Sequence, residues 1–358
     1  MDVLVVNAGS SSLKLRVLGS DDDLLGERDL DAPRSAVDDG ELQRALRDLP
    51  DAGAVGHRVV HGGTRFRDAV RIDDDVVHAL HELTDLAPLH QPKSLAALEA
   101  TARALPDTPA VACFDTAFHA TLPDAAATYA LPATLRERFG VRRYGFHGLS
   151  HAYAARRARE LAPGARRIVT CHLGAGASLA AVLDGRSVDT TMGFTPLEGL
   201  VMATRSGSVD PGLVLWLLEH GRMRESELAA ALEHDSGLLG LAGSADMREI
   251  LARDDDAARL ALDVYVHRLR AGIAAMAAAL GGVDALAFTG GVGERAPAIR
   301  ARAVGGLGFL GAELDDARNR AADGDADIGA DGAAVRAFVI AAREDLEIAR
   351  QVRAVLSA

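Results

Sequence analysis

Two segments of the chain share one hydrophobic pattern. Residues 3–6 form an apolar run, a turn of small and polar residues follows, and a second strand begins at Leu13. Residues 168–182 repeat this plan around a Gly-rich turn, and residues 186–191 continue it as a further hairpin strand. Two such hairpins in the two halves of the chain favour a duplicated domain. The simpler alternative is a coincidence between two Gly-rich hairpins.

Apolar residues recur at helical spacing in the stretches between the hairpins and after them. This spacing predicts helices over residues 91–104 and 257–280. A short apolar strand over residues 285–289 then runs into a glycine-rich turn at residues 290–294. Strands and helices in this mixture indicate an α/β protein.

Length and charge narrow the class of protein. The 358 residues are enough for two domains. The net charge of −12 argues against a nucleic-acid binder, so an anionic substrate would need a local basic pocket. Cys113 and Cys171 lack metal or redox spacing and fit a reducing compartment. With no signal-peptide pattern and no stretch long enough to span a membrane, we expect a cytoplasmic protein that binds neither nucleic acid nor membrane.

The turn after the first strand has the composition of a phosphate-binding loop. It brings backbone amides, serine hydroxyls and Lys14 close together, which suits a bound phosphate. Only Lys14 and Lys93 are lysines among 39 basic residues. A lysine at this turn, where the chain otherwise uses arginine, indicates a need for a compact point charge. Ser11 and Lys14 also match the Ser-x-x-Lys pattern of serine acyl-transferring enzymes, but that chemistry needs the serine at a helix start, with companion motifs that are absent.

A second glycine motif is not a nucleotide signature. Gly306, Gly308 and Gly311 have Gly-x-Gly-x-x-Gly spacing but follow a helical stretch instead of a strand. We interpret them as a helix terminus and turn.

Four residues are candidates for phosphoryl-transfer chemistry. Arg58, in a strand beside a glycine pair, can bind a carboxylate or phosphate, and Asp115 follows an apolar strand where α/β sites gather polar groups. Arg205 lies in a small-residue loop, as a transition-state clamp requires. His147 is flanked by aromatic residues and stands four residues before His151, a spacing that also permits zinc on a helix. Taken singly, each of these residues could also have a purely structural role at a strand edge, at a helix cap or in an ordinary turn.

Taken together, these motifs resemble the acetate kinase (acetokinase) family. The matching segments, in order, are VNAGSSSLK, GHRVVHGG, APLHQP, FDTAFH, YGFHGLSH, HLGAGAS, TPLEGL, TRSGSVDPG, SADMR, FTGGVGE and Glu344. Their order and spacing are specific, although each one alone would be weak.

The resemblance implies the fold and the domain division. It implies two duplicated actin-like ATPase domains, each a ribonuclease H-like mixed sheet flanked by helices, with a nucleotide cleft between them. The N-terminal domain would span residues 1–119 and be completed by a C-terminal helix at residues 346–358. The nucleotide-binding domain would span residues 120–345.

The resemblance also implies the reaction and the residues that carry it. The family transfers the γ-phosphoryl group of ATP to acetate, reversibly, giving acetyl phosphate and ADP. Asp115, His147, Arg205 and Arg58 would be catalytic, with Arg58 also binding acetate. Asn7 and Glu344 would place Mg²⁺, with Mn²⁺ as a possible substitute. The acetate methyl pocket would comprise Val60, Leu89, Phe146 and Pro196. The nucleotide would be bound by Ser10, Ser12, Lys14, His172, Leu173, Gly174, Ala175, Gly176, Asp246, Met247, Arg248, Gly291, Val292, Gly293, Glu294 and Arg295.

Three positions depart from the family pattern. Ala175 and Arg295 stand where the family usually has Asn beside the nucleotide, and Gln91 stands where it usually has Asn beside the acyl pocket. The nucleotide or phosphoryl-donor preference is therefore open. So is the choice between acetate and a longer acid, because one methylene in an apolar pocket changes binding by only about 1–3 kcal/mol. The resemblance also implies a homodimer. The alternatives are a propionate or butyrate kinase of the same fold and a non-catalytic nucleotide-binding protein.

Overall fold

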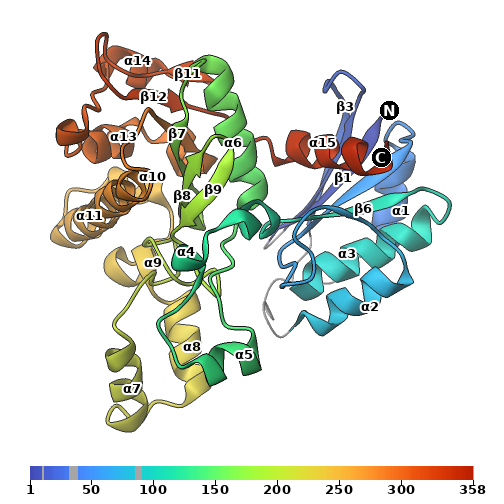
Figure 1. Ribbon diagram of the computed structural model, residues 1–358, viewed down its shortest axis with the longest axis horizontal. Helices are drawn as coiled ribbons and strands as arrows, with labels where there is room; N and C mark the ends of the chain where they lie inside the picture. Colours follow the sequence, from blue (N-terminus) through green and yellow to red (C-terminus); the bar gives the residue numbers. More distant parts are fainter. Residues whose placement is uncertain (10–11, 32–38, 85–90, 358) are drawn as a thin grey trace. The chain divides into compact units, whose positions relative to one another are not determined.

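The computed structural model describes residues 1–9, 12–31, 39–84 and 91–357, and the chain divides into two compact units (Figure 1). The first unit comprises Met1–Ala120, Phe146–Tyr153 and Arg343–Ala358. The second comprises Thr121–Gly145 and Ala154–Ala342. Residues 146–153, which the sequence prediction assigned to the second domain, belong to the first unit.

The first unit is built on a six-stranded mixed sheet with the order β3-β2-β1-β4-β6-β5. Its strands are β1 (Val3–Ala8), β2 (Ser12–Leu18), β3 (Leu24–Asp31), β4 (Ala54–Val59), β5 (Val70–Arg71) and β6 (Ala110–Phe114). β1, β4 and β6 run parallel, whereas β2, β3 and β5 are antiparallel to their neighbours. The carboxyl ends of the three central strands therefore meet at one edge of the sheet.

The second unit repeats this sheet. Its strands are β7 (Arg167–Leu173), β8 (Ala177–Leu183), β9 (Arg186–Thr190), β10 (Ala285–Thr289), β11 (Ala326–Asp327) and β12 (Arg336–Val339). Read from β9, the order is β9-β8-β7-β10-β12-β11, with β7, β10 and β12 parallel and the outer pairs antiparallel. Strand order and strand direction are the same in both units, so the predicted duplication is confirmed.

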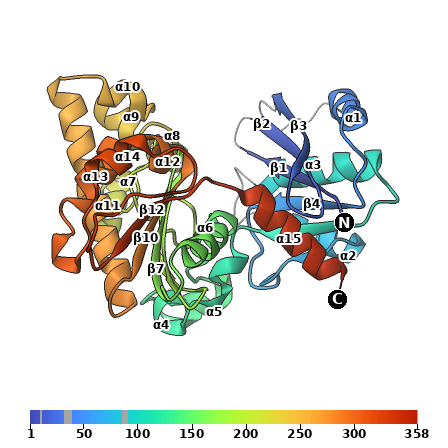
Figure 2. The ribbon, with the colours of Figure 1, turned by 90° about the horizontal axis from the view of Figure 1, so that it is seen from above.

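Helices cover both faces of the first sheet because side chains on β1 alternate between them. Leu4 and Val6 pack toward α1 (Asp39–Arg47) and α3 (Gln91–Ala104), whereas Val3 and Val5 pack toward α15 (Glu344–Leu356). α2 (Asp74–Glu82) packs beside α3. Figure 2 shows α15 lying across the strands.

The close approach of α15 depends on a glycine in β4. A Cβ atom at Gly56 would lie 2.5 Å from Ile348 Cγ2 and 2.7 Å from Val352 Cγ2. Real Cβ atoms do not approach other atoms this closely, so Gly56 lets the helix dock on the sheet.

The second unit is mainly helical around its sheet. Its helices are α4 (Asp124–Ala127), α5 (Ala133–Phe139), α7 (Pro211–Glu219), α8 (Glu225–His234), α9 (Gly237–Ala242), α10 (Met247–Leu251), α11 (Asp256–Ala279), α12 (Gly290–Arg295), α13 (Pro297–Val304) and α14 (Asp316–Ala321). α6 (Gly148–Leu161) contributes residues to both units. The Gly306, Gly308 and Gly311 motif forms a turn around a short 3₁₀ helix after α13, as predicted. Over the described ranges, no helix is long and apolar enough to cross a membrane.

Candidate functional site

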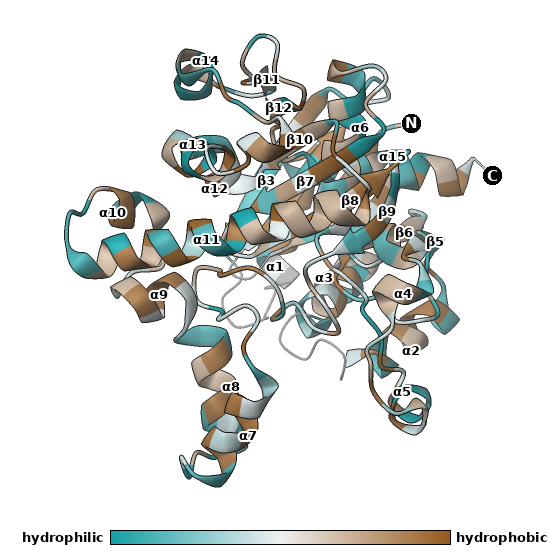
Figure 3. Ribbon diagram, turned by 60° about the vertical axis from the view of Figure 1, so that its left-hand side comes forward, coloured by the Kyte–Doolittle hydropathy of each residue, from teal (hydrophilic) through white to brown (hydrophobic). Residues whose placement is uncertain are grey.

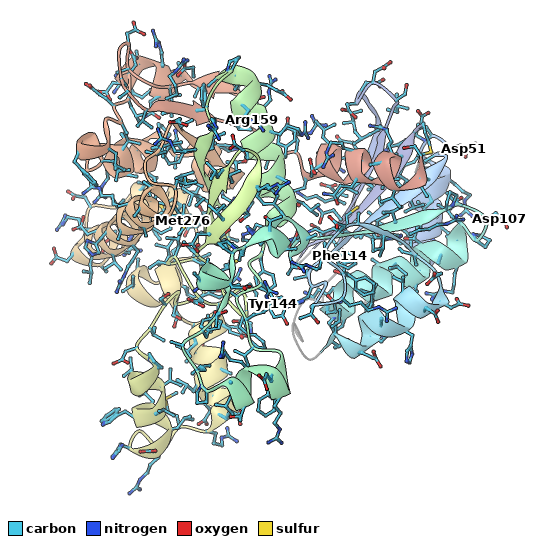
Figure 4. The ribbon with its side chains drawn as sticks, in the orientation of Figure 1. Asp51, Asp107, Phe114, Tyr144, Arg159 and Met276 are labelled. Carbon is cyan, nitrogen blue, oxygen red and sulfur yellow. The ribbon has the colours of Figure 1, made fainter. Side chains whose placement is uncertain are left out.

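A polar cluster lies at the carboxyl ends of β1, β4 and β6 in the first unit. Asn7, Arg58 and Asp115 fall on the sheet face that α15 covers, because they continue the inside–outside alternation of these strands. Glu344 joins them as the first residue of α15. Figure 4 labels Phe114, the residue of β6 directly before Asp115.

The cluster is connected by short hydrogen bonds. Arg58 donates from Nη2 to Asp115 Oδ2 at 2.6 Å, and from Nε to both carboxylate oxygens at 3.2 Å. It also donates from Nη1 to Asn7 Oδ1 at 3.2 Å, while Asn7 Nδ2 donates to Glu344 Oε2 at 2.9 Å. Arg58 Nε lies 3.9 Å from Glu344 Oε2. The structure thus brings together four residues that the sequence analysis selected from separate motifs.

Burial makes this ion pair an electrostatically strong one. Asp115 is fully buried, and only 16% of the Arg58 side chain is exposed. Burial alone would lower the pKa of the Arg58 guanidinium, but the negative charges of Asp115 and Glu344 raise it above its ordinary value. Burial raises the pKa of the Asp115 carboxyl, and the charge of Arg58 opposes that shift. Arg58 is therefore a permanently charged group in a fixed orientation.

His147 stands in a turn next to this cluster. The turn precedes α6, and its next residue, Gly148, donates its backbone N–H to the Asp115 carbonyl at 2.8 Å. His147 has a φ of 57°, an uncommon left-handed conformation for a residue with a side chain. His151, which made zinc an alternative, is fully buried in α6 with its ring centroid 5.6 Å from that of His119. This position fits a core histidine.

Arg205 lies in a well-anchored loop of the second unit. Its Nη1 donates to the Pro196 carbonyl at 2.7 Å. This hydrogen bond joins the loop of Arg205, a predicted catalytic residue, to the segment of Pro196, a predicted residue of the acetate pocket. Burial lowers the pKa of Arg205. Gly237, at the start of α9, has a φ of 62°, and a Cβ atom there would lie 2.7 Å from the Arg205 carbonyl oxygen. The loop and α9 are thus in close backbone contact.

Two predicted nucleotide segments also lie side by side in the second unit. Residues 172–176 comprise the last two residues of β7 and the turn that follows it. Residues 291–295 belong to α12, which follows β10. A Cβ atom at Gly290 would lie 2.8 Å from the Leu173 carbonyl oxygen, so the start of α12 contacts the end of β7. Ala203 donates its N–H to the Ala175 carbonyl at 3.1 Å, which connects the first turn to the Arg205 loop.

The third predicted nucleotide segment starts α10. Asp246 caps this helix by accepting from the Arg248 N–H at 2.8 Å, and its carboxylate pairs with the Arg248 guanidinium at 2.6 Å. These hydrogen bonds lower the pKa of Asp246 to about 2. The Arg248 side chain is 88% exposed.

The remaining predicted residues are placed as follows. Val60 and Phe146 are buried in the first unit, whereas Ser10 and Leu89 lie outside the described residues. Lys14 is exposed on β2 directly opposite Asn7 in the strand ladder. Ser11, the serine of the Ser-x-x-Lys pattern, lies outside the described residues, and the residues after it, Ser12–Leu18, form strand β2 instead of a helix.

The sequence analysis assigned no supporting role to the residues that hold the candidate site in place. Gln91 is fully buried, and its side chain bonds both the N–H and the carbonyl of His61, at 3.2 Å each. His119 and Gly148 hold the His147 turn, and Arg300 holds α12. Gln91, His119 and Gly148 lie inside the matched motifs. Their supporting contacts join separate segments of the chain, so no local pattern could have indicated that role.

The fold identifies the class of protein. Duplicated mixed sheets of this order, flanked by helices, are the actin-like ATPase fold. The model of the acetokinase family matches residues 32–350, and the chain belongs to that family.

Several relatives and solved structures are similar to this chain. The acetate kinase of Nostoc punctiforme is 49% identical over 88% of this chain and 79% of its own length. That of Shouchella clausii is 40% identical over 97% of this chain and 98% of its own. The crystal structure of Porphyromonas gingivalis acetate kinase matches with a TM-score of 0.90 and 35% identity, over 99% of each chain. A propionate kinase from Francisella tularensis matches with a TM-score of 0.90 and 33% identity, also over 99% of each.

Proposed function

We propose that this chain is an acetate kinase, which transfers the γ-phosphoryl group of ATP reversibly to acetate, giving acetyl phosphate and ADP. The observation that carries the mechanism is the hydrogen-bonded cluster of Asn7, Arg58, Asp115 and Glu344. Phosphoryl transfer needs positioning and charge stabilisation more than covalent help from the protein, and this cluster offers both.

In the proposed mechanism, Arg58 binds the acetate carboxylate and the phosphoryl group. An acetate oxygen attacks the γ-phosphorus while the bond from that phosphorus to the bridging oxygen breaks, and ADP leaves with the electron pair. Asp115 holds Arg58 at the angle this requires, since it accepts three of its hydrogen bonds. His147 and Arg205 stabilise the negative charge on the equatorial oxygens of the transition state.

The polar cluster also fits a magnesium ion. Asn7 Oδ1 accepts from Arg58, and Asn7 Nδ2 donates to the Glu344 carboxylate. The amide oxygen of Asn7 and the carboxylate of Glu344 are hard oxygen ligands, which suit Mg²⁺, with Mn²⁺ as a substitute. Among the described residues, no group of three or more His, Cys, Asp or Glu side chains could hold a metal by itself. Substrate phosphates would complete the coordination, and the ion would neutralise part of their charge. Lys14, which pairs with Asn7 in the strand ladder, would add its positive charge to that of the ion beside the phosphates.

The substrate-binding assignments complete the proposal. Val60, Phe146 and Pro196, together with Leu89, receive the acetate methyl group. ATP is bound by residues 172–176, Asp246 to Arg248 and Gly291 to Arg295, with Ser10 and Ser12 near the phosphates. The enzyme works as a homodimer in the cytoplasm.

The experiment that tests this function compares kcat/KM for acetate, propionate and butyrate on the purified chain with ATP and Mg²⁺. Product is trapped as the acyl hydroxamate. We expect acetate to give the highest value. A higher value for propionate would identify the chain as a propionate kinase, the activity named for its Francisella tularensis structural relative. Absence of any hydroxamate would favour a non-catalytic nucleotide-binding protein.

A further inference from the structure

We propose that His119 is a positioning residue for His147. It holds the turn that presents the His147 side chain through a hydrogen bond from its Nε2 to the Phe146 carbonyl, at 3.0 Å. The inference rests on the proposed role of His147 in phosphoryl transfer.

The His147 backbone needs such support. Its φ of 57° lies in the left-handed region, where a residue with a Cβ atom stays only if its surroundings enforce it. The residues on either side of His147 are each held by a hydrogen bond to one of their own backbone atoms. The Phe146 carbonyl accepts from His119, and the Gly148 N–H donates to the Asp115 carbonyl at 2.8 Å. The strained residue is therefore fixed from both sides.

Both anchors come from one short stretch of chain. Asp115 directly follows β6, and His119 lies in the 3₁₀ helix that follows, η3 (Ala117–Thr121). The contact is tight, since a Cβ atom on Gly148 would lie 2.1 Å from the Asp115 carbonyl oxygen. The stretch that orients Arg58 through Asp115 thus also orients His147.

The chemistry of His119 suits this task. It is 1% exposed, and burial lowers its pKa to about 4, with the Phe146 carbonyl opposing that shift. The ring is therefore neutral at neutral pH, and because a carbonyl can only accept, Nε2 carries the proton. The ring is also packed edge-on against Phe118 and His151, which leaves it little freedom to turn.

Substitutions at His119 separate positioning from simple packing. In His119→Gln the amide nitrogen takes roughly the place of Nε2 and can still donate to the Phe146 carbonyl. His119→Leu fills the space without a donor, and the shorter His119→Asn serves as a second disrupting variant if His119→Leu does not fold. The matched control is His57→Leu, because His57 is equally buried in the first unit with a pKa lowered to about 4, but lies on β4 as part of the opposite sheet face.

We expect His119→Leu and His119→Asn to lower kcat by about 10–100-fold, with little change in the KM for ATP, because small displacements of a catalytic group have effects of this size. His119→Gln should restore most of the lost kcat. His57→Leu should lower the urea midpoint of unfolding without lowering kcat. If His119→Gln is as impaired as His119→Leu, or if His119→Leu and His119→Asn keep the wild-type kcat, the proposal is wrong.

A double-mutant cycle with His147→Ala shows whether His119 acts through His147. We expect His119→Leu to cause no further loss of kcat in the His147→Ala background. An equal loss in both backgrounds would overturn the proposal for His119 while the role of His147 stands. A wild-type kcat in His147→Ala would instead remove the proposed role of His147, and the proposal for His119 with it.

Discussion

Three of the buried histidines make the stability of the first unit depend on pH. His57, His61 and His119 are at most 2% exposed, and burial lowers the pKa of each to about 4. In the unfolded chain their pKa returns to about 6.5. Between these values the unfolded state binds more protons than the folded state, so stability is fully present above about pH 6.5 and falls as pH drops toward 4.

We therefore expect the urea midpoint to fall steeply between pH 6.5 and 4, with about three protons taken up on unfolding near pH 5. This corresponds to a slope of about 4 kcal/mol per pH unit. Unfolding curves at half-unit pH intervals measure it. His57→Leu should reduce the slope by about one third, and an unchanged slope would show that His57 is not neutral in the folded protein.

Residues that carry the chemistry could be predicted from the sequence more readily than those that support it. Arg58 and Asp115 stand at strand ends inside distinctive motifs, and the structure places both on one sheet face. Gln91 was noted only as a departure from the family pattern. Its role depends on a contact with His61, 30 positions away, which no local pattern encodes.

At the scale of secondary-structure elements, α12 is the segment whose position depends most clearly on a single side chain. Arg300 is 1% exposed and donates to the carbonyls of Gly293 and Glu294, the last turn of α12, at 2.8 and 2.7 Å. It also bonds the side chain and backbone carbonyls of Asn319 in α14, at 2.8 and 2.6 Å. Burial lowers its pKa to about 10, so it remains charged at neutral pH and complements the negative end of α12.

We expect Arg300→Met to raise the KM for ATP several-fold and to leave the KM for acetate nearly unchanged, because it loosens a proposed nucleotide segment. Leaving buried carbonyls without donors should also lower the free energy of unfolding by about 1–3 kcal/mol. Steady-state kinetics and urea unfolding measure the two effects. Arg302→Met, on the same helix but paired with Asp263 at the surface, is the matched control. An equal rise in the KM for acetate and in the KM for ATP would argue against a specific effect on α12.

The helix boundaries predicted from the sequence agree with the structure where a capping side chain fixes the helix end. The helix predicted over residues 257–280 is α11, Asp256–Ala279, whose start is fixed by Asp255 accepting from the Ala258 N–H. The predicted helix 91–104 matches α3, Gln91–Ala104. Short elements such as β5 and β11, with two residues each, carry no periodic signal, so they could be found only from the structure.

At the scale of the whole molecule, α7 leaves an apolar surface uncovered. No residue of this nine-residue helix is buried, and Leu213, Leu215 and Trp216 are 46%, 60% and 54% exposed. Figure 3 draws part of α7 in brown, the colour of hydrophobic residues. Exposed aromatic and aliphatic side chains grouped on one element are typical of protein interfaces. A second copy of the chain can cover this surface with its own α7, since a two-fold interface uses the same patch on both subunits. This is the surface on which we expect the proposed homodimer to form.

Trp216 is the only tryptophan of the chain and so reports on this surface directly. We expect a dimer by sedimentation equilibrium, and a red shift of tryptophan emission when dilution separates the subunits. Leu215→Asp should give a monomer at concentrations where the wild type is dimeric, because it would place charged groups in an apolar interface. Leu260→Asp, at an equally exposed leucine on α11, should leave the dimer intact. A dimer that survives Leu215→Asp but not Leu260→Asp would place the interface on α11 instead.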